Sequence, residues 1–165
     1  MVRSVSHPAR GALLLAICCL AAVGSATGVA QEKGDVAVVV HPDVPVDNLS
    51  LSDLRRLVLG EREFWPGSVR VTLLIRAPVA HERDVILKTV CQMTEARFRQ
   101  HWIAKVFRAD TAVAPRIVYS TEMSIDLVKR TPGAIAFLEA SQAGRNLKVV
   151  KIDGRLPGDP GYLLR

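Results

Sequence analysis

The clearest pattern of apolar and polar positions runs from residue 49 to residue 60. Apolar residues recur there at spacings of three, six and seven, which places them on one face of a helix. They are Leu51, Leu54, Leu57 and Val58. Either Ser50 or Ser52 can cap this helix by accepting backbone N–H bonds, and Gly60 stands where a left-handed residue commonly ends a helix. The pattern therefore predicts an amphipathic helix with a defined start and end.

Short, almost continuous apolar runs recur along the rest of the chain. Such runs are typical of strands that are buried on both faces of a sheet. They cover residues 36–40, 71–75, 134–138 and 147–152, and residues 116–119 are expected to form a further, brief strand. The tripeptide Trp65-Pro66-Gly67 predicts a turn before the second of these strands.

Three more helices are expected between the strands. The first covers residues 81–92, the second begins after Thr94, and the third runs from Ser120 or Thr121 to Arg130. In the second, Phe98, Trp102 and Val106 recur every four residues, and we interpret them as core. Strands that alternate with helices indicate an α/β fold with a mixed sheet and helices on both faces. The segment 154–165, rich in Gly and Pro, is expected to be loosely held.

The first 30 residues have the pattern of a cleavable export signal. Arg3 and Arg10 precede an apolar core from residue 11 to residue 23, and small residues follow at 28–30. The apolar run is shorter than the roughly 20 residues that a membrane span needs. We therefore expect a signal peptide over 1–30, a mature domain over 31–165 with its core at about 36–152, a periplasmic location, and no stable membrane insertion. The alternative is that the exported protein is a lipoprotein, with a lipid attached at Cys18.

Charge and cysteine content narrow the function classes. The formal net charge is +6 for the whole chain and +4 once Arg3 and Arg10 are removed with the signal, since 6 − 2 = 4. The basic residues are scattered and do not alternate with aromatic residues, so nucleic-acid binding is not expected. A mildly basic domain suits anionic ligands or an acidic partner. Cys91 is the one cysteine after residue 30 and is expected to be a buried structural thiol.

The segment HPDVPVDNLSLSDLRRLVLGEREFW at 41–65, the strand that ends at Arg76 and the downstream PGAIAF at 132–137 carry a family resemblance. Together they resemble the phosphate-binding proteins of bacterial ABC uptake systems, and more closely the small single-lobe relatives of those proteins. The resemblance covers about residues 36–152. It implies a single lobe of a type II periplasmic-binding-protein-like fold and a role in solute binding.

A ligand in such a fold is expected at the carboxyl ends of the strands, where helix N-termini attract anions. Arg76 is the strongest candidate, because a guanidinium at a strand end can hold an oxyanion such as phosphate. The alternative for Arg76 is an ion pair with Glu82 or Asp84. His81, Ser120 and Thr121 are weaker candidates as hydrogen-bond donors to the same anion.

Directly after Arg76, the sequence differs from the pattern of the phosphate-binding proteins. In the phosphate-binding proteins the strand-end Arg is followed by an Asp-Gly-Ser-Gly-Thr loop that wraps the anion. Arg76 and Ala77 match the start of that pattern, and residues 78–82 here read Pro-Val-Ala-His-Glu. Both hydroxyls and both glycines of the loop are replaced.

The resemblance and the altered loop after Arg76 lead to two alternative functions. The first is an exported solute-binding or sensing module, related to phosphate transport, that binds an oxyanion weakly. The second is a protein-interaction module of the envelope, acting as a homodimer or with another protein, that has lost the ligand site. No catalytic motif, metal-ligand spacing or cofactor motif occurs, so neither an enzyme nor a cofactor or metal site is expected.

Overall fold

The computed structural model describes residues 34–111 and 113–165. The predicted signal peptide over 1–30 and its Cys18 lie outside these residues. In the described part, six strands form one mixed sheet in the order β2-β6-β1-β5-β3-β4. The strands are β1 (Val36–Val40), β2 (Asn48–Leu49), β3 (Thr72–Arg76), β4 (Arg116–Val118), β5 (Ala134–Glu139) and β6 (Lys148–Ile152).

The first strand lies in the middle of the sheet. β1 is antiparallel to both β5 and β6, with Val38 opposite Phe137 on one side and Val150 on the other. β3 is parallel to β5 and to β4, and β2 is parallel to β6. All five residues of β1 are buried, because neighbours on both edges and helices on both faces surround this Val- and Ala-rich strand.

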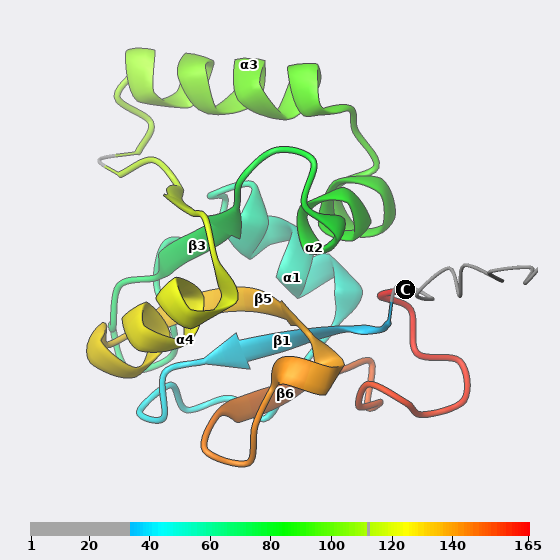
Figure 1. Cartoon of the computed structure of the whole chain (residues 1–165). Coiled ribbons are helices and arrows are strands. Elements are labelled where there is room, and N and C mark those ends of the chain that lie inside the picture. Colours follow the sequence, from blue (N-terminus) through cyan, green and yellow to red (C-terminus); the bar gives the residue numbers. More distant parts are fainter. Residues whose placement is uncertain (1–33, 112) are drawn as a thin grey trace, which may run out of the picture. The chain divides into compact units, whose positions relative to one another are not determined.

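Helices cover both faces of the sheet, as predicted. They are α1 (Leu51–Val58), α2 (His81–Val85) with the π-helical η1 (Ile86–Cys91), α3 (Glu95–Phe107) and α4 (Thr121–Arg130), and a short 3₁₀ helix η2 covers Ala140–Gln142. The larger core packs α1, α2, η1 and part of α3 against the side chains of Val36, Val38 and Val40. The smaller core lies under α4, around Ala37 and Val39. Figure 1 shows α4 in front of the sheet and α1 behind it.

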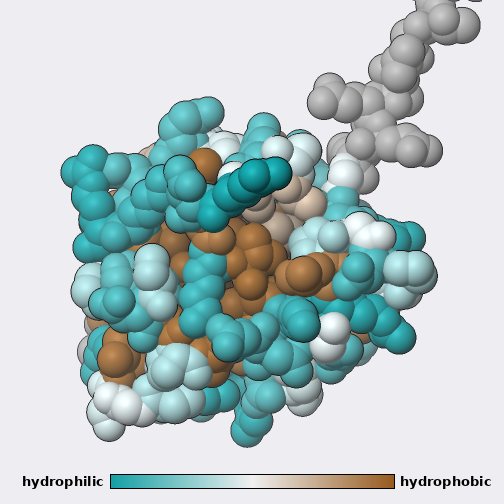
Figure 2. All heavy atoms as spheres, turned by 90° about the horizontal axis from the view of Figure 1, so that it is seen from below, coloured by the Kyte–Doolittle hydropathy of each residue, from teal (hydrophilic) through white to brown (hydrophobic). Residues whose placement is uncertain are grey.

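The α4 face is only partly covered. Leu147 and Val149 pack against the smaller core and remain partly exposed. Figure 2, which views the molecule from below Figure 1, the side on which β6 lies, shows hydrophobic surface between hydrophilic side chains.

The local signals around α1 are confirmed. Ser50 is the N-cap, and its Oγ accepts a hydrogen bond from the backbone N–H of Asp53 at 3.0 Å. Gly60 follows the C-cap with φ +66°, and a Cβ there would lie 2.5 Å from Cη2 of Trp102. Gly60 is thus needed both for its backbone conformation and for the close approach of the Trp102 ring.

Two details of the helices differ from the sequence-based expectations. The helix expected over 81–92 is α-helical only to Val85 and continues as a π-helix that ends at the left-handed Gln92. Val106 is 47 % exposed, because α3 packs against the sheet through Phe98 and Trp102 and its C-terminal half stands away from the core.

The C-terminal segment is not loosely held. Leu164 is fully buried, and its carbonyl accepts a hydrogen bond from the N–H of Val36 at 2.8 Å. The hydroxyl of Tyr162 donates to the carbonyl of Val36 at 2.7 Å. The expectation was wrong because two apolar side chains of this Gly- and Pro-rich segment fill the end of the larger core.

In the part of the chain that the structure describes, none of the helices is both long enough and apolar enough to span a bilayer.

Candidate functional site

The predicted site residues lie at one edge of the sheet. Parallel pairing puts the ends of β3 and β4 together, with Arg76 opposite Val118, and the N–H of Ala77 donates to the carbonyl of Val118 at 2.9 Å. α4 begins directly after β4, so its N-terminus lies beside the end of β3. We call this region, made by Arg76–Glu82 and Tyr119–Glu122, the strand-end edge.

Arg76 points into a largely closed environment at this edge. Its side chain is 16 % exposed, and its Nε lies 3.4 Å from Oε1 of Glu82, which is buried. Nε and Nη1 of Arg76 are buried and have no hydrogen-bond partner among the described residues. The ion pair with Glu82, which was the alternative for Arg76, is therefore present, and it leaves hydrogen-bonding capacity of the guanidinium unused.

The other three candidates at the strand-end edge already have partners within the chain. Ser120 caps α4, its Oγ accepting from the N–H of Met123 at 3.1 Å. The hydroxyl of Thr121 donates to Oε1 of Gln142 at 2.8 Å, and Nε2 of His81 lies 3.1 Å from the carbonyl of Gly34. Each of these residues would have to exchange a partner to meet a ligand.

A second carboxylate faces the same edge. The pKa of Glu122 lies below its usual value, first because its carboxylate accepts the backbone N–H of the same residue, then because Ser120 donates to it, with a further contribution from the charge of Arg76. The charge of Arg76 thus acts on its ion-pair partner Glu82 and, more weakly, on the exposed Glu122, which lowers the positive potential available to a ligand.

Sequence reasoning missed Arg83, which holds the edge in place. Its Nη1 donates to the carbonyl of Arg76 at 2.7 Å, and its Nε and Nη2 donate to the two carboxylate oxygens of Glu95 at 2.8 and 2.9 Å. The guanidinium also lies over the ring of Phe98, 5.4 Å from its centroid. A buried arginine with a bidentate partner joins the end of β3 to α3, and only its position after a strand end could have drawn attention to it.

The loop between β3 and α2 contains a strained position. Val79 is fully exposed and has φ +68°, a conformation that is unusual for a β-branched residue and ordinary for glycine. It lies in the segment where the phosphate-binding proteins carry glycines, so the loop keeps a glycine-like turn without the glycine.

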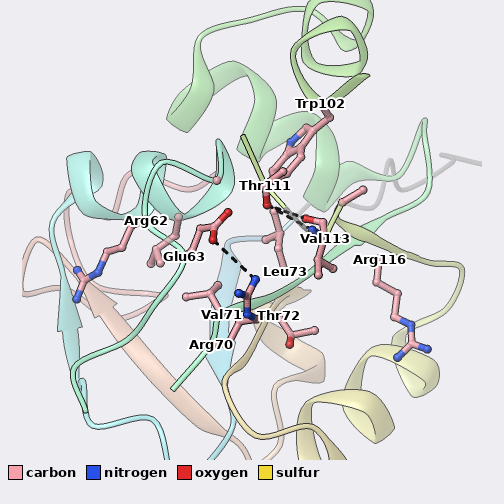
Figure 3. A pocket seen from close by; sticks show the side chains of 13 residues that line it. Arg62, Glu63, Arg70, Val71, Thr72, Leu73, Trp102, Thr111, Val113 and Arg116 are labelled. Carbon is pink, nitrogen blue, oxygen red and sulfur yellow. Dashed lines mark hydrogen bonds and ion pairs between the residues drawn. The ribbon is translucent and has the colours of Figure 1, made fainter. Parts of the chain in front are cut away.

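A pocket of about 400 Å³ opens between α1, α3 and β3, away from the strand-end edge. Figure 3 shows the indole ring of Trp102 entering it from α3, and Glu63 with Arg70 beside it. Nη1 of Arg70 lies 3.7 Å from Oε2 of Glu63. The sequence analysis did not single out this pocket, because its walls come from segments far apart in the chain.

An apolar groove of about 440 Å³ lies on the other side of Trp102. The exposed side chains of Ile103, Val106 and Phe107 on α3 and of Ile117 on β4 line it. Its two charged lining residues are Arg83 and Arg99.

Metal binding finds no support in the described residues, where no three His, Cys, Asp or Glu side chains gather. Burial raises the pKa of the Cys91 thiol to about 12, so Cys91 is the inert structural thiol that the sequence predicted.

No protein-family model matches the sequence, and no curated protein matches it. Solved structures do. An ABC-type phosphate transport receptor from Vibrio cholerae matches with a TM-score of 0.61 and 18 % identity, over 75 % of this chain and 48 % of the receptor. PstS from Borrelia burgdorferi matches with a TM-score of 0.63 and 13 % identity, over 79 % and 54 %.

A phosphate ABC transporter substrate-binding protein from Clostridium perfringens, solved with bound phosphate, matches with a TM-score of 0.59 and 19 % identity, over 73 % of this chain and 46 % of that one. The chain thus spans about half the length of these proteins. The similarity confirms the predicted α/β fold of the periplasmic-binding-protein type, and it extends over about half of each of these proteins, as expected for a single lobe.

Proposed function

We propose that this chain, which has the fold of about half of a phosphate-binding protein, is an exported solute-binding module of the periplasm that accepts an oxyanion at the strand-end edge through Arg76. One observation supports it most directly: Nε and Nη1 of Arg76 are buried without a hydrogen-bond partner in the described part of the chain. Buried N–H groups are seldom left unpaired, and a guanidinium matches the geometry of an oxyanion.

Glu82 is expected to keep this binding weak. Its carboxylate is the anion that Arg76 contacts in the structure, so a bound phosphate has to share the guanidinium with it. Two unit charges about 4 Å apart interact by about 1 to 4 kcal/mol at effective dielectric constants between those of water and a protein surface. The proposed role is binding without catalysis, in keeping with neighbours whose names describe binding proteins and transport receptors.

The test is a phosphate titration followed by ¹H–¹⁵N NMR, at constant ionic strength, on the wild type and on Glu82→Gln. Removing the competing charge is expected to tighten phosphate binding by about tenfold, since 1.4 kcal/mol corresponds to a factor of ten. Glu61→Gln is the matched control, because Glu61 is exposed and precedes β3, at the opposite end of that strand from Arg76.

A further variant separates binding from folding. The double change Arg76→Gln with Glu82→Gln removes both charges together, so no unpaired charge stays buried. It is expected to keep the native spectrum and to lose phosphate binding. If Glu82→Gln binds phosphate no better than the wild type, or if the double variant binds as well as Glu82→Gln, the assignment to Arg76 is wrong.

The second function, a protein-interaction module of the envelope, is favoured by the apolar groove beside α3. Ile103 and Phe107 expose most of their side chains there, which is unusual for apolar residues in one continuous groove. Arg83 is buried and paired with Glu95, whereas Arg99 is exposed, and none of the described residues that line the groove is acidic. The groove therefore suits an apolar segment with an acidic flank better than a second copy of itself. Sedimentation velocity over a wide range of protein concentrations is expected to show a monomer; self-association that Phe107→Ser abolishes would instead identify a homodimer.

A further inference from the structure

Two residues that line the pocket beside Trp102 each carry a buried polar atom that the chain itself leaves unpaired. The two atoms are the indole Nε1 of Trp102 and Oε1 of Glu63, and neither has a hydrogen-bond partner among residues 34–111 and 113–165. Trp102 is 8 % exposed and thus more than nine-tenths buried. Leaving a buried donor or acceptor unpaired costs about 1 to 3 kcal/mol, so two such atoms in one pocket call for a bound partner.

The other tryptophan shows what a satisfied indole looks like in this fold. Nε1 of Trp65 donates to the carbonyl of Gly133 at 2.9 Å, and Trp65 is likewise buried. The missing partner is therefore particular to Trp102 and to the pocket that it enters (Figure 3).

The chemistry of the two atoms defines what can pair with them. An indole N–H only donates, so it requires an acceptor, whereas an ionised carboxylate oxygen only accepts and requires a donor. Nη1 of Arg70 lies 3.7 Å from Oε2 of Glu63, and its guanidinium lies 5.0 Å from the centroid of the Phe64 ring, so Oε1 of Glu63 stays without a partner among the described residues. Three arginines and one glutamate line the pocket, so charge alone does not exclude an anion. A ligand that only accepts hydrogen bonds would leave Oε1 of Glu63 unpaired, and one that only donates would leave Nε1 of Trp102 unpaired.

The walls of the pocket suit an apolar or aromatic body. Leu57, Val71, Leu73 and Ala114 line it. Its volume of about 400 Å³ lies within the range of roughly 300 to 1,000 Å³ found for small-molecule sites, which combine apolar walls with a few polar groups that set orientation.

We propose that this pocket binds a small uncharged molecule with an amide-like group on an apolar or aromatic body. The carbonyl of the amide accepts from Nε1 of Trp102, and its N–H donates to Oε1 of Glu63. The site is separate from the strand-end edge and does not depend on the function proposed for Arg76.

The experiment uses three probes of similar shape with the full ¹⁵N-labelled chain: benzamide, which carries both an acceptor and a donor, benzoate, which only accepts, and benzylammonium, which only donates. Benzamide is expected to shift the indole N–H signal of Trp102 and to leave that of Trp65 in place, with an affinity at least threefold above either other probe. The Trp65 signal thus serves as an internal control for unspecific effects.

Two variants complete the test. Glu63→Ala is expected to weaken benzamide binding by about tenfold, because it removes a charge-assisted hydrogen bond, while Glu61→Ala, an exposed neighbour, is expected to leave it unchanged. The spectrum of each variant reports directly whether it is folded. Equal shifts with all three probes, no shift of the Trp102 signal at any benzamide concentration, or equal affinity in Glu63→Ala would overturn the proposal and indicate that the two atoms meet only water.

Discussion

The buried end of the chain makes a sharp prediction about stability. Leu164→Ala removes a fully buried side chain from the larger core, while its neighbour Leu163 is 42 % exposed. Replacing a buried leucine with alanine costs about 2 to 5 kcal/mol, because the apolar transfer energy is lost and a cavity remains. For a domain of this size, unfolding entropy converts each kcal/mol into about 4 °C, so the melting temperature is expected to fall by about 8 to 20 °C.

The assay is urea and thermal unfolding of both single variants, followed by circular dichroism. Leu163→Ala keeps the same length, composition and backbone and is expected to lose less than about 1 kcal/mol, as surface substitutions do. Equal, small losses in the two variants would refute the reasoning, since they would mean that the C-terminal segment does not contribute to the core in solution.

Other predictions concern the close contact at α1, the buried thiol and the buried phenol. Gly60→Ala is expected to cost more than about 2 kcal/mol by urea unfolding, because its Cβ would meet Trp102, whereas Gly67→Ala, also at positive φ but with open space around it, is expected to cost about 1 kcal/mol. The Cys91 thiol, its pKa raised to about 12 by burial, is expected to react with iodoacetamide at pH 8 only as fast as the chain unfolds; peptide mass spectrometry that finds rapid native-state labelling would contradict this. Burial raises the pKa of Tyr162 above its usual value of 10.0, so the folded state holds the proton more tightly, and the stability contributed below pH 10 is expected to decline as the pH rises beyond it; Tyr162→Phe should flatten that decline in unfolding curves measured against pH.

Features of this fold that depend on neighbouring residues were predictable. Ser50 and Gly60 mark the ends of α1, and their capping and left-handed roles are local properties that hold in the structure. The strands β1, β3 and β5 were likewise visible, because a strand covered on both faces has to be apolar throughout. The expectation was wrong for β6, which is only partly covered and exposes Lys151. The helix positions and the fold class follow from the same periodicities.

Features that depend on distant partners were not predictable. Nothing near Val106 indicates that the C-terminal half of α3 stands away from the sheet, and nothing in the composition of the last residues indicates that Leu164 enters the core. At the candidate site, the sequence correctly predicted that Arg76 ends a strand, but it did not show whether Arg76 pairs with Glu82 or with Asp84. The packing of α2 brings Glu82 to Arg76. The pocket at Trp102 and Glu63 joins residues 39 positions apart, since 102 − 63 = 39, and single-segment patterns do not detect such pairs.

The central place of β1 has a consequence for how the chain folds. β1 is the first strand in the sequence, and both of its neighbours, β5 and β6, come from the last third of the chain. Contacts between residues so far apart form slowly, because a long loop has to close before they are made. A growing polypeptide therefore carries Val36–Val40 unpaired until almost all of it has been synthesised. An apolar, β-prone segment that waits this long is exposed to aggregation, and a chaperone that holds the nascent chain unfolded is expected to raise the yield of the native protein.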